Sequence, residues 1–275
     1  MKKLTVRVGA LERDESAYRC RRVMSASELL EGPLGRGVII AAHPDDEIIG
    51  AGILLSRLPC ADVLHVTDGA PRYLANWSEY AARRRHEATA TLALLGRESL
   101  SVQCLGIPDQ EAILEIVNLA QQLADLLTNY DFIVTHAYEG GHSDHDATAL
   151  SVHAACHRIQ ESGRDPPSIF EMTGYHGLDS EDYVRGVFIP HPDAGAVAEL
   201  ILTPAERHLK SRMFACHASQ QVVLKGFSLE VERFRSAPHY DFLAPPHGGR
   251  LLYDGLQWRR AADHGLTGLG LLDRM

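Results

Sequence analysis

The sequence predicts an α/β protein with a Rossmann-like, three-layer α/β/α arrangement around a mostly parallel sheet. Short apolar runs are followed by polar turns and then by stretches of helical periodicity, and this order is repeated along the first half of the chain. Strands that alternate with helices in this way form βαβ units, with helices on both faces of the sheet.

The individual elements follow from the apolar pattern. The expected buried strands are 38–42, 61–67 and 131–136, and the expected helices are 46–58, 78–95, 111–130 and 147–159. Beyond residue 165 we expect strands at 168–173 and 183–189, a helix at 204–223, and a loop that wraps the body from Arg233 onwards. No repeat, linker or change of composition divides the chain, so we expect a single domain over residues 1–275 with its core at about 37–220.

Composition excludes several classes of protein. A formal net charge of −9 and a pI near 5.9 exclude a basic nucleic-acid surface, and no run reaches the about 18–20 apolar residues of a membrane span. The N-terminal residues 1–7 reach a charge before any apolar core develops, so we expect no export signal. The odd number of cysteines without close pairs predicts reduced thiols and a cytoplasmic location (Cys20, Cys60, Cys104, Cys156 and Cys216).

Ionisable side chains are concentrated in two segments that directly follow expected strands. The first is 43–47, His-Pro-Asp-Asp-Glu, and the second is 138–146, which contains His142, Asp144 and His145. Because ligands bind at the carboxyl ends of the strands in such sheets, we expect the two segments to face each other across one crevice. Burying so many polar groups together is costly unless they bind something.

Imidazoles and a carboxylate that converge from two strand ends predict a metal site with open coordination positions. That arrangement is typical of a catalytic metal, whereas a structural zinc ion has all four positions filled by the protein. The alternative is that both segments are ordinary turns, with Asp46 capping the next helix. The occurrence of both segments at strand ends favours the metal site.

The two segments also resemble a known family. Residues 42–47, Ala-His-Pro-Asp-Asp-Glu, and 141–145, Gly-His-Ser-Asp-His, are similar to the two signature motifs of the PIG-L/LmbE-like N-acetylglucosaminyl deacetylase family, in the order and separation expected for it. The resemblance covers most of residues 37–220, and its weaker parts are 67–69, Arg84 with Glu87, 105–109, Lys210, and 217–220.

The resemblance implies a zinc ion (Zn²⁺), or another divalent metal, held by His43, Asp46 and His145. It also implies that the adjacent Asp45 is the general base. These roles are chemically consistent, because bound zinc lowers the pKa of its water to about 7 and a nearby carboxylate can then remove the proton. The different roles of the two adjacent aspartates come from the family and not from the spacing.

His142 and Asp144 are the remaining catalytic candidates from the second motif. The resemblance implies that His142 polarises the amide oxygen or protonates the departing amine, and that Asp144 orients His142. Some members place a tyrosine close before this motif, whereas this chain has Gly140 and Gly141 there. Either Tyr138 substitutes for that tyrosine or the glycines widen the pocket.

Three further residues are candidates for substrate contacts. Arg84 is a candidate for hydroxyl or phosphate groups, Asp109 for a sugar hydroxyl, and Trp77 for stacking on a sugar ring. Their alternatives are a solvated helix surface, an ordinary turn and core packing, respectively. His153 and His157 are spaced for metal binding on one helix, but without a nearby acid we interpret them as helix-face residues.

The leading hypothesis is a metal-dependent hydrolase that removes an N-acyl group, such as acetyl, from an amino sugar or sugar conjugate. The first alternative is a Rossmann-like nucleotide- or cofactor-binding enzyme, which is disfavoured because acids replace Gly-x-Gly-x-x-Gly after the first strand. The second alternative is a non-catalytic carbohydrate-binding protein that retains the metal site. The expected partner is a small N-acetylated sugar or conjugate, and the sequence leaves a homo-oligomer open.

Overall fold

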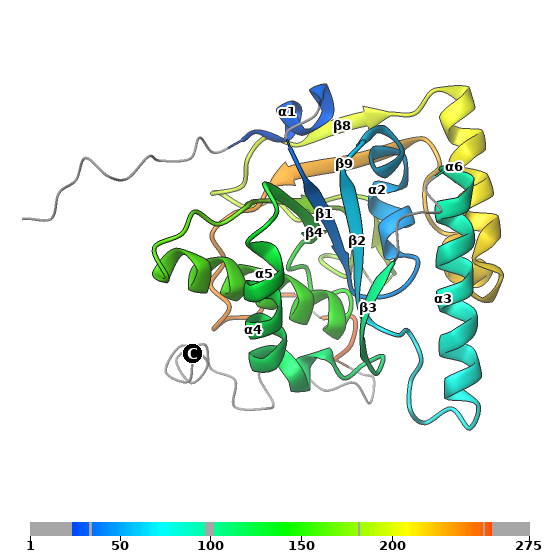
Figure 1. The fold of residues 1–275 in the computed structure, drawn as a ribbon, viewed down its shortest axis with the longest axis horizontal. Coiled ribbons are helices and arrows are strands. Elements are labelled where there is room, and N and C mark those ends of the chain that lie inside the picture. The colour runs from blue at the N-terminus through cyan, green and yellow to red at the C-terminus, as the bar shows by residue number, and fades with distance from the viewer. Residues whose placement is uncertain (1–23, 33–34, 97–101, 181, 250, 255–275) are drawn as a thin grey trace, which may run out of the picture.

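A seven-stranded sheet forms the centre of the protein (Figure 1). The computed structural model describes residues 24–254 apart from 33–34, 97–101, 181 and 250, so the N-terminal segment 1–7, Cys20 and the chain beyond 254 lie outside the described residues. The strands lie in the order β3 (Gln103–Ile107), β2 (Ala61–Thr67), β1 (Gly37–Ala41), β4 (Phe132–His136), β5 (Ser168–Met172), β9 (Val231–Ser236) and β8 (Ala198–Ile201). The first five strands are parallel, while β9 and β8 are antiparallel additions.

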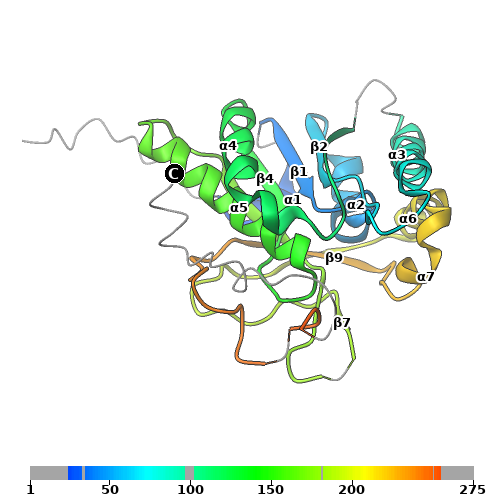
Figure 2. The same cartoon turned by 90° about the horizontal axis from the view of Figure 1, so that it is seen from below.

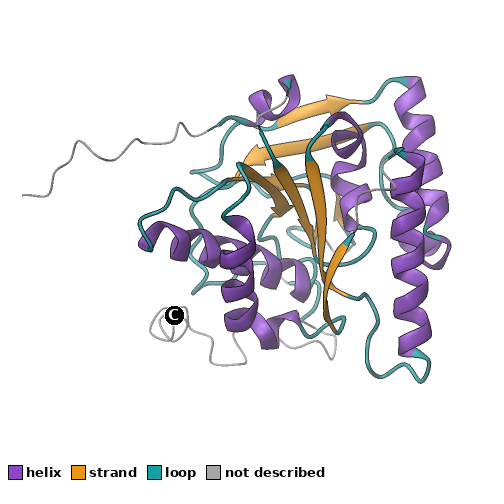
Figure 3. Ribbon diagram, viewed as in Figure 1, coloured by secondary structure: helices purple, strands orange, loops and turns teal. Residues whose placement is uncertain are grey.

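Helices cover both faces of the sheet (Figures 1 and 2). One face carries α2 (Asp46–Arg57), α3 (Trp77–Leu94) and α6 (Pro204–Cys216), and the other carries α4 (Ile116–Leu127) and α5 (Ser143–Glu161). Figure 3 shows the resulting helix, strand and helix layers. The predicted three-layer α/β/α class with a mostly parallel sheet is therefore confirmed.

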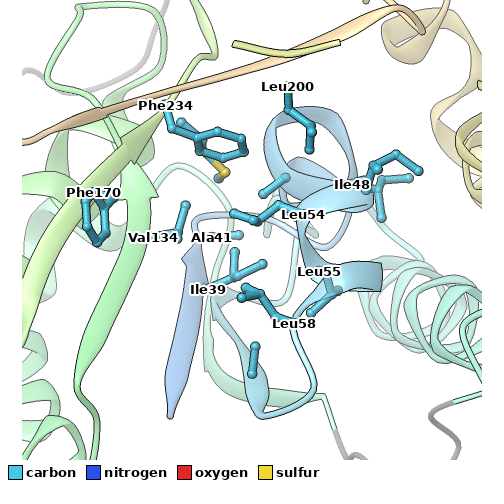
Figure 4. Close-up of a cluster of buried hydrophobic side chains, with 14 of the residues drawn as sticks. Ile39, Ala41, Ile48, Leu54, Leu55, Leu58, Val134, Phe170, Leu200 and Phe234 are labelled. Carbon is cyan, nitrogen blue, oxygen red and sulfur yellow. The ribbon is translucent and has the colours of Figure 1, made fainter. Parts of the chain in front are cut away.

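Alternation along β1 explains why the sheet is buried on both faces. Ile39 and Ala41 point into the core beneath α2, which Figure 4 shows, whereas Val38 and Ile40 point into the core beneath α4 and α5. Side chains of successive strand residues point to opposite faces, so a continuous apolar run fits a strand that is covered on both sides. This burial holds the end of β1, and the first motif that follows it, in a fixed position.

Helix α2 is interrupted one turn after that motif. Ala51 has non-helical φ and ψ angles of −144° and 21°. The carboxylate of Glu232, from β9, accepts the free N–H groups of Ile53 and Leu54 at 2.8 and 2.9 Å. Lys210, from α6, donates to Glu232 at 2.8 Å, and both side chains are fully buried. A buried ion pair thus satisfies the backbone groups that the interruption leaves open.

Several predicted elements in the first half of the chain closely match observed ones, with small shifts at the ends. The expected strand 61–67 coincides with β2, and the expected helices 46–58 and 78–95 correspond to α2 and α3. The expected helix 111–130 is a 3-10 turn, η2 (Ala112–Glu115), followed by α4. Helix α5 begins four residues earlier than expected, so much of the second motif lies in its first turn.

The second half corrects the predictions in several places. The strand expected at 183–189 is reduced to β7 (Val184–Arg185), which pairs with β6 (Tyr175–His176) outside the main sheet. The loop expected from Arg233 is wrong at its start, because Arg233 lies inside β9. Helix α6 ends at Cys216 and is followed by η3 (Ala218–Gln220) and α7 (Gln221–Leu224).

The elements that were not predicted include α1 (Ala26–Glu31), β3, β6 and β8. Strand β8 is an edge strand with alternating buried and exposed residues, so it lacks the apolar run that identifies the central strands. None of the described helices is both long and apolar enough to cross a membrane. The cysteines in the described part of the chain are free thiols.

Candidate metal centre

The two motifs lie side by side because β1 and β4 are adjacent parallel strands. The first motif follows β1 and continues into α2, and the second follows β4 and continues into α5, whose N-cap residue is His142. The carboxyl ends of parallel strands meet at one edge of the sheet, as expected. The structure therefore brings residues about a hundred positions apart into one buried group.

Asp46 is the centre of this group. Its Oδ2 atom lies 3.1 Å from Nδ1 of His43 and 3.3 Å from Nε2 of His145, and all three side chains are buried. Burial favours protonation of Asp46, but the imidazoles of His145 and His136 outweigh it and hold the pKa well below its ordinary value. Burial lowers the pKa of His145 to about 4, which leaves its ring neutral and able to bind a metal.

Asp46 lies close enough to His43 and to His145 for each pair to share a divalent ion. Zinc bonds of about 2.0–2.2 Å in a tetrahedral site place neighbouring ligand atoms about 3.3 Å apart. The distances of 3.1 and 3.3 Å from Asp46 to the two histidines agree with this spacing. Two imidazoles and one carboxylate would also leave coordination positions for water and substrate, as in catalytic zinc sites.

His136, the last residue of β4, belongs to this group and was not predicted. Its ring stacks on that of His145 with 4.0 Å between the centroids, and its Nε2 atom lies 3.5 Å from Asp46. The same nitrogen accepts the N–H of Ala42 at 2.9 Å, so its lone pair is already used. With this bond His136 supports Asp46 and His145, and the three residues also form a group of potential ligand atoms within 4.8 Å of one another. A histidine at the end of an otherwise apolar strand is the signal that could have indicated it.

Asp45 points in a different direction from Asp46. Its Oδ1 atom accepts a hydrogen bond from Nη2 of Arg84 at 2.6 Å. Its φ angle of 148° lies in a region that residues with a side chain rarely adopt, so the surrounding contacts must hold the Asp45 backbone in this conformation. Burial raises the pKa of Asp45 to about 7, although Arg84 opposes the shift. Asp45 thus lies beside the metal-ligand candidates without joining their contacts to Asp46.

Arg84 is buried, so the alternative that it lies on a solvated helix surface is wrong. Besides Asp45, its guanidinium group donates to the carbonyl oxygens of Pro44 and Gly69 at 2.9 and 3.0 Å. It reaches the site from α3 and fixes the turns after β1 and β2. Its contact with substrate remains a prediction.

Asp144 contacts more than the histidine it was predicted to orient. Its backbone N–H donates to Nδ1 of His142 at 3.1 Å, while its carboxylate lies 3.1 Å from Nε2 of His43. The carboxylate also accepts the N–H groups of Gln110 and Ala112 at 2.6 and 3.1 Å. Asp144 is fully buried and is thus positioned to orient His43 as well as His142.

His142 is neutral in this arrangement. Burial and the nearby ring of His43 lower its pKa to about 3. Since Nδ1 accepts the Asp144 N–H, the ring proton is on Nε2. Asp109, His43, His142 and Asp144 form one group of potential ligand atoms that all lie within 4.8 Å of one another, and His43, His142 and His145 form another. The Oδ1 atom of Asp109 is buried without a hydrogen bond from the described residues, 3.4 Å from Nε2 of His43.

The aromatic candidates lie apart from the motifs. Trp77 is the first residue of α3, is 40% exposed, and packs under the guanidinium group of Arg72 at 4.0 Å. The hydroxyl of Tyr138 donates to the carbonyl oxygen of Ala244 at 2.9 Å. The structure gives neither ring a contact with His43, Asp46 or their neighbours among the residues described. Stacking of Trp77 on a sugar remains a prediction.

The two glycines before His142 do not widen a pocket. A Cβ atom on Gly141 would lie 1.9 Å from the carbonyl oxygen of Tyr175, and one on Gly140 would lie 2.5 Å from the side chain of Leu251. The space beside the two glycines is therefore filled by Tyr175 of β6 and by Leu251. The expectation that the glycines widen the pocket is wrong. The ring of Tyr175 also packs against His145, with 5.4 Å between the centroids.

The other histidines singled out in the sequence lie outside the candidate metal-ligand groups of the described residues. His153 packs against Tyr240 and Phe242, and the exposed His157 lies 3.3 Å from Glu161. The fully buried His217 lies 3.1 Å from the hydroxyl of Thr91.

Comparisons with known proteins agree with the resemblance of the motifs. Residues 38–156 match the PIG-L family, described as GlcNAc-PI de-N-acetylase. The zinc-inhibited form of teicoplanin deacetylase Orf2 has a similar fold, with a TM-score of 0.55, 17% identity, and coverage of 75% of this chain and all of that one. An N,N'-diacetylchitobiose deacetylase from Pyrococcus horikoshii has a TM-score of 0.50 and 19% identity, over 74% of this chain and 84% of that one.

The same fold also occurs in a protein with another activity. GalB, the 4-carboxy-2-hydroxymuconate hydratase from Pseudomonas putida KT2440, has a TM-score of 0.51 and 15% identity, over 75% of this chain and 98% of that one. At such identities the likeness shows the fold alone, so the reaction must be argued from the site. No curated protein sequence matches this chain significantly.

Proposed function

We propose that the protein is a divalent-metal-dependent hydrolase that removes an N-acyl group from an amino sugar or sugar conjugate. The match of residues 38–156 to the PIG-L family supports this proposal. One observation carries the proposal. His43 and His145 each lie within hydrogen-bond distance of Asp46, while the neighbouring Asp45 is bound by Arg84 instead. A metal site beside a separate carboxylate is the arrangement that hydrolysis of an amide requires.

The metal would be held by His43 Nδ1, Asp46 and His145 Nε2. Zinc is the ion that this donor set suits best, and when bound it supplies Lewis-acid activation of water and of the amide oxygen. The second ring nitrogen of His43 faces the carboxylates of Asp144 and Asp109. A carboxylate on the far side of a ligating imidazole fixes its tautomer and strengthens it as a ligand.

The protein's own groups move the protons. Asp45, held beside Arg84, takes a proton from the attacking water as its oxygen bonds to the acyl carbon. His142, with its proton on Nε2, donates to the developing oxyanion. Asp45 then returns the proton to the nitrogen as the carbon–nitrogen bond breaks, which yields a free amine and a carboxylic acid.

Two residues are proposed to bind the sugar near the site. The Oδ1 atom of Asp109 is buried with only Nε2 of His43 at 3.4 Å beside it and no hydrogen bond among the described residues, so it is suited to accept a sugar hydroxyl. The substrate class of N-acetylglucosamine conjugates is supported by the family description. Trp77 is proposed to contact a more distant part of the conjugate, because it is exposed and is the first residue of α3.

We also propose a reducing, cytoplasmic location, since the described cysteines are free.

The alternative functions are less well supported. A nucleotide phosphate would need free backbone N–H groups after β1, but those of His43 and Asp45 donate to the carboxylates of Asp46 and Glu47 at 2.8 and 3.0 Å. A non-catalytic sugar-binding protein would not need Asp45 to be held apart from the ligands. Both observations favour the hydrolase.

Metal analysis combined with an amine-release assay tests the proposal. Wild-type protein should contain about one equivalent of zinc or another divalent ion and release amine from some N-acetylated amino sugars. Asp45→Asn should keep the metal and lose about 10²–10⁴-fold in kcat, whereas Asp46→Asn and His145→Ala should lose the metal. A folded wild-type protein that binds no divalent metal, or an Asp45→Asn variant as active as wild type, would reject the hydrolase.

A further inference from the structure

The backbone of Asp45 is held by a buried pair that has no role in the proposed chemistry. Glu47, in the first turn of α2, and His65, in β2, are 3% and 1% exposed. Oε2 of Glu47 accepts the N–H of Asp45 at 3.0 Å and lies 2.9 Å from Nε2 of His65. One carboxylate oxygen therefore connects the middle of β2 to the residue proposed as the general base.

The conformation of Asp45 explains what this connection does. Its φ of 148° is costly for a residue with a side chain, by about 1–3 kcal/mol, and persists only where the surroundings enforce it. The carbonyl oxygen of Asp45 accepts the N–H groups of Ile48 and Ile49, both at 3.1 Å, which fixes the peptide group between Asp45 and Asp46. The Glu47 carboxylate accepts the N–H of Asp45 and fixes the peptide group between Pro44 and Asp45.

His65 is positioned by the sheet and fixes Glu47 in turn. It pairs in register with Ala41 at the end of β1, so its location depends on β-sheet hydrogen bonds and not on the motif loop. The same Oε2 atom of Glu47 lies 2.9 Å from Nε2 of His65 and 3.0 Å from the backbone nitrogen of Asp45, so His65 fixes the oxygen that accepts the Asp45 N–H.

We infer that Glu47 and His65 are positioning residues that hold the strained backbone of Asp45, and so direct its carboxylate to Arg84 instead of the metal ligands. This inference rests on the proposed function for its catalytic consequence, but not for its structural content. With the bond to Glu47 removed, the backbone of Asp45 relaxes to negative φ and its carboxylate leaves Arg84. The metal ligands keep their own contacts.

The kinetic test uses Glu47→Ala with Glu47→Gln as the conservative variant. Glu47→Ala should lower kcat about 100-fold, because a displacement of about 1 Å in a catalytic group has an effect of this size. Its KM and zinc content should stay within about threefold of wild type, since neither substrate contacts nor ligands are removed. Glu47→Gln keeps an oxygen that can accept both N–H groups and should recover most of the loss. A folded Glu47→Ala variant with wild-type kcat would overturn the inference.

Glu87→Ala is the matched control for loss of a buried carboxylate. Glu87 is 5% exposed and accepts the N–H and the hydroxyl of Ser219 at 2.9 and 2.6 Å, and neither of these contacts involves a motif residue. It should lower the melting temperature and leave kcat unchanged. Equal losses of kcat in Glu87→Ala and Glu47→Ala would mean that Glu47 acts only on general stability, which contradicts a positioning role.

Two further measurements keep the inference testable. If Glu47→Ala does not fold, His65→Phe removes the second N–H with little change of volume, and kcat should fall about tenfold at constant zinc content. If wild type hydrolyses no amide, the proposed function fails, and a crystal structure of the Glu47 variant decides the inference by itself. A negative φ at Asp45 and loss of its contact with Arg84 would support the inference, and an unchanged loop would overturn it.

Discussion

Arg84 and Asp45 face each other in the interior of the protein, with 2.6 Å between Nη2 of the guanidinium group and Oδ1 of the carboxylate. Arg84 comes from the middle of α3 and Asp45 from the turn after β1, so only the folded chain brings them together. This contact separates the two adjacent aspartates of the first motif, because Asp45 is bound to a cation while Asp46 is left to the histidines.

Arg84→Met should lower kcat about 100-fold without loss of zinc. The variant leaves the Asp45 carboxylate without its cation and free to turn toward the metal ligands. Activity and metal content of the purified variant check this. Arg36→Met is a suitable control, because Arg36 pairs with Asp62 at 2.8 Å before β1 and should leave kcat unchanged. Loss of zinc together with activity would show that Arg84 supports the metal ligands instead.

Asp144→Ala should weaken zinc binding about 10–100-fold, the usual effect of removing a carboxylate behind a ligating histidine. The reason is its 3.1 Å contact with Nε2 of His43. Competition with a chelator of known affinity gives the dissociation constant. His142→Ala is the comparison, and we expect its zinc affinity to stay within about threefold of wild type. If Asp144→Ala binds zinc normally, the contact of its carboxylate with His43 does not strengthen the metal site.

Gly141→Ala should destabilise the protein by about 1–3 kcal/mol and lower activity, because its Cβ would collide with the backbone of Tyr175 at 1.9 Å. Urea unfolding measures the free energy of unfolding. Gly248→Ala is the control, since a Cβ there meets nothing within 4 Å. Equal stability of the two variants would mean that the β6 segment moves aside easily.

Lys210→Met should lower the free energy of unfolding by about 3–5 kcal/mol, because it leaves the Glu232 carboxylate buried without its cation. The double variant Lys210→Met/Glu232→Gln should recover part of this loss, since glutamine carries no charge and still accepts from the backbone of α2. Denaturant unfolding of wild type and both variants checks this. A double variant no more stable than the single one would show that the charge of Glu232 is not the cause.

Glu139→Gln should reduce the loss of stability as the pH rises. Burial raises the pKa of Glu139 to about 8, so the folded state holds a proton that the unfolded chain releases near pH 4.5. The stability of wild type should therefore fall between about pH 4.5 and 8, by on the order of 5 kcal/mol from this group, and level off above that. Unfolding at pH 5, 7 and 9 measures the difference. The exposed Glu79→Gln variant should follow wild type, and a parallel course for Glu139→Gln would contradict the assignment.

Much of the fold could be predicted because its central strands are covered on both faces. Strands β1, β2 and β4 are apolar runs bounded by polar turns, a pattern that is local in sequence. Strand β8 could not be found in this way, because it is short, lies at the sheet edge and alternates in burial. The loop expected at Arg233 is a strand for a related reason, since pairing with β5 and β8 stabilises it and its own composition does not.

By itself, the sequence determined the α/β class, the two motif segments and their location at strand ends. These features depend on apolar periodicity and turn residues, which are patterns of residues close together in the sequence. Only the tertiary structure decided which side chains meet. The pairing of β1 with β4 brings His145 close to Asp46 and His43. The packing of α3 beside the turn after β1 buries Arg84 and places it against Asp45. Contacts of this kind depend on the packing of distant segments, which no local pattern encodes.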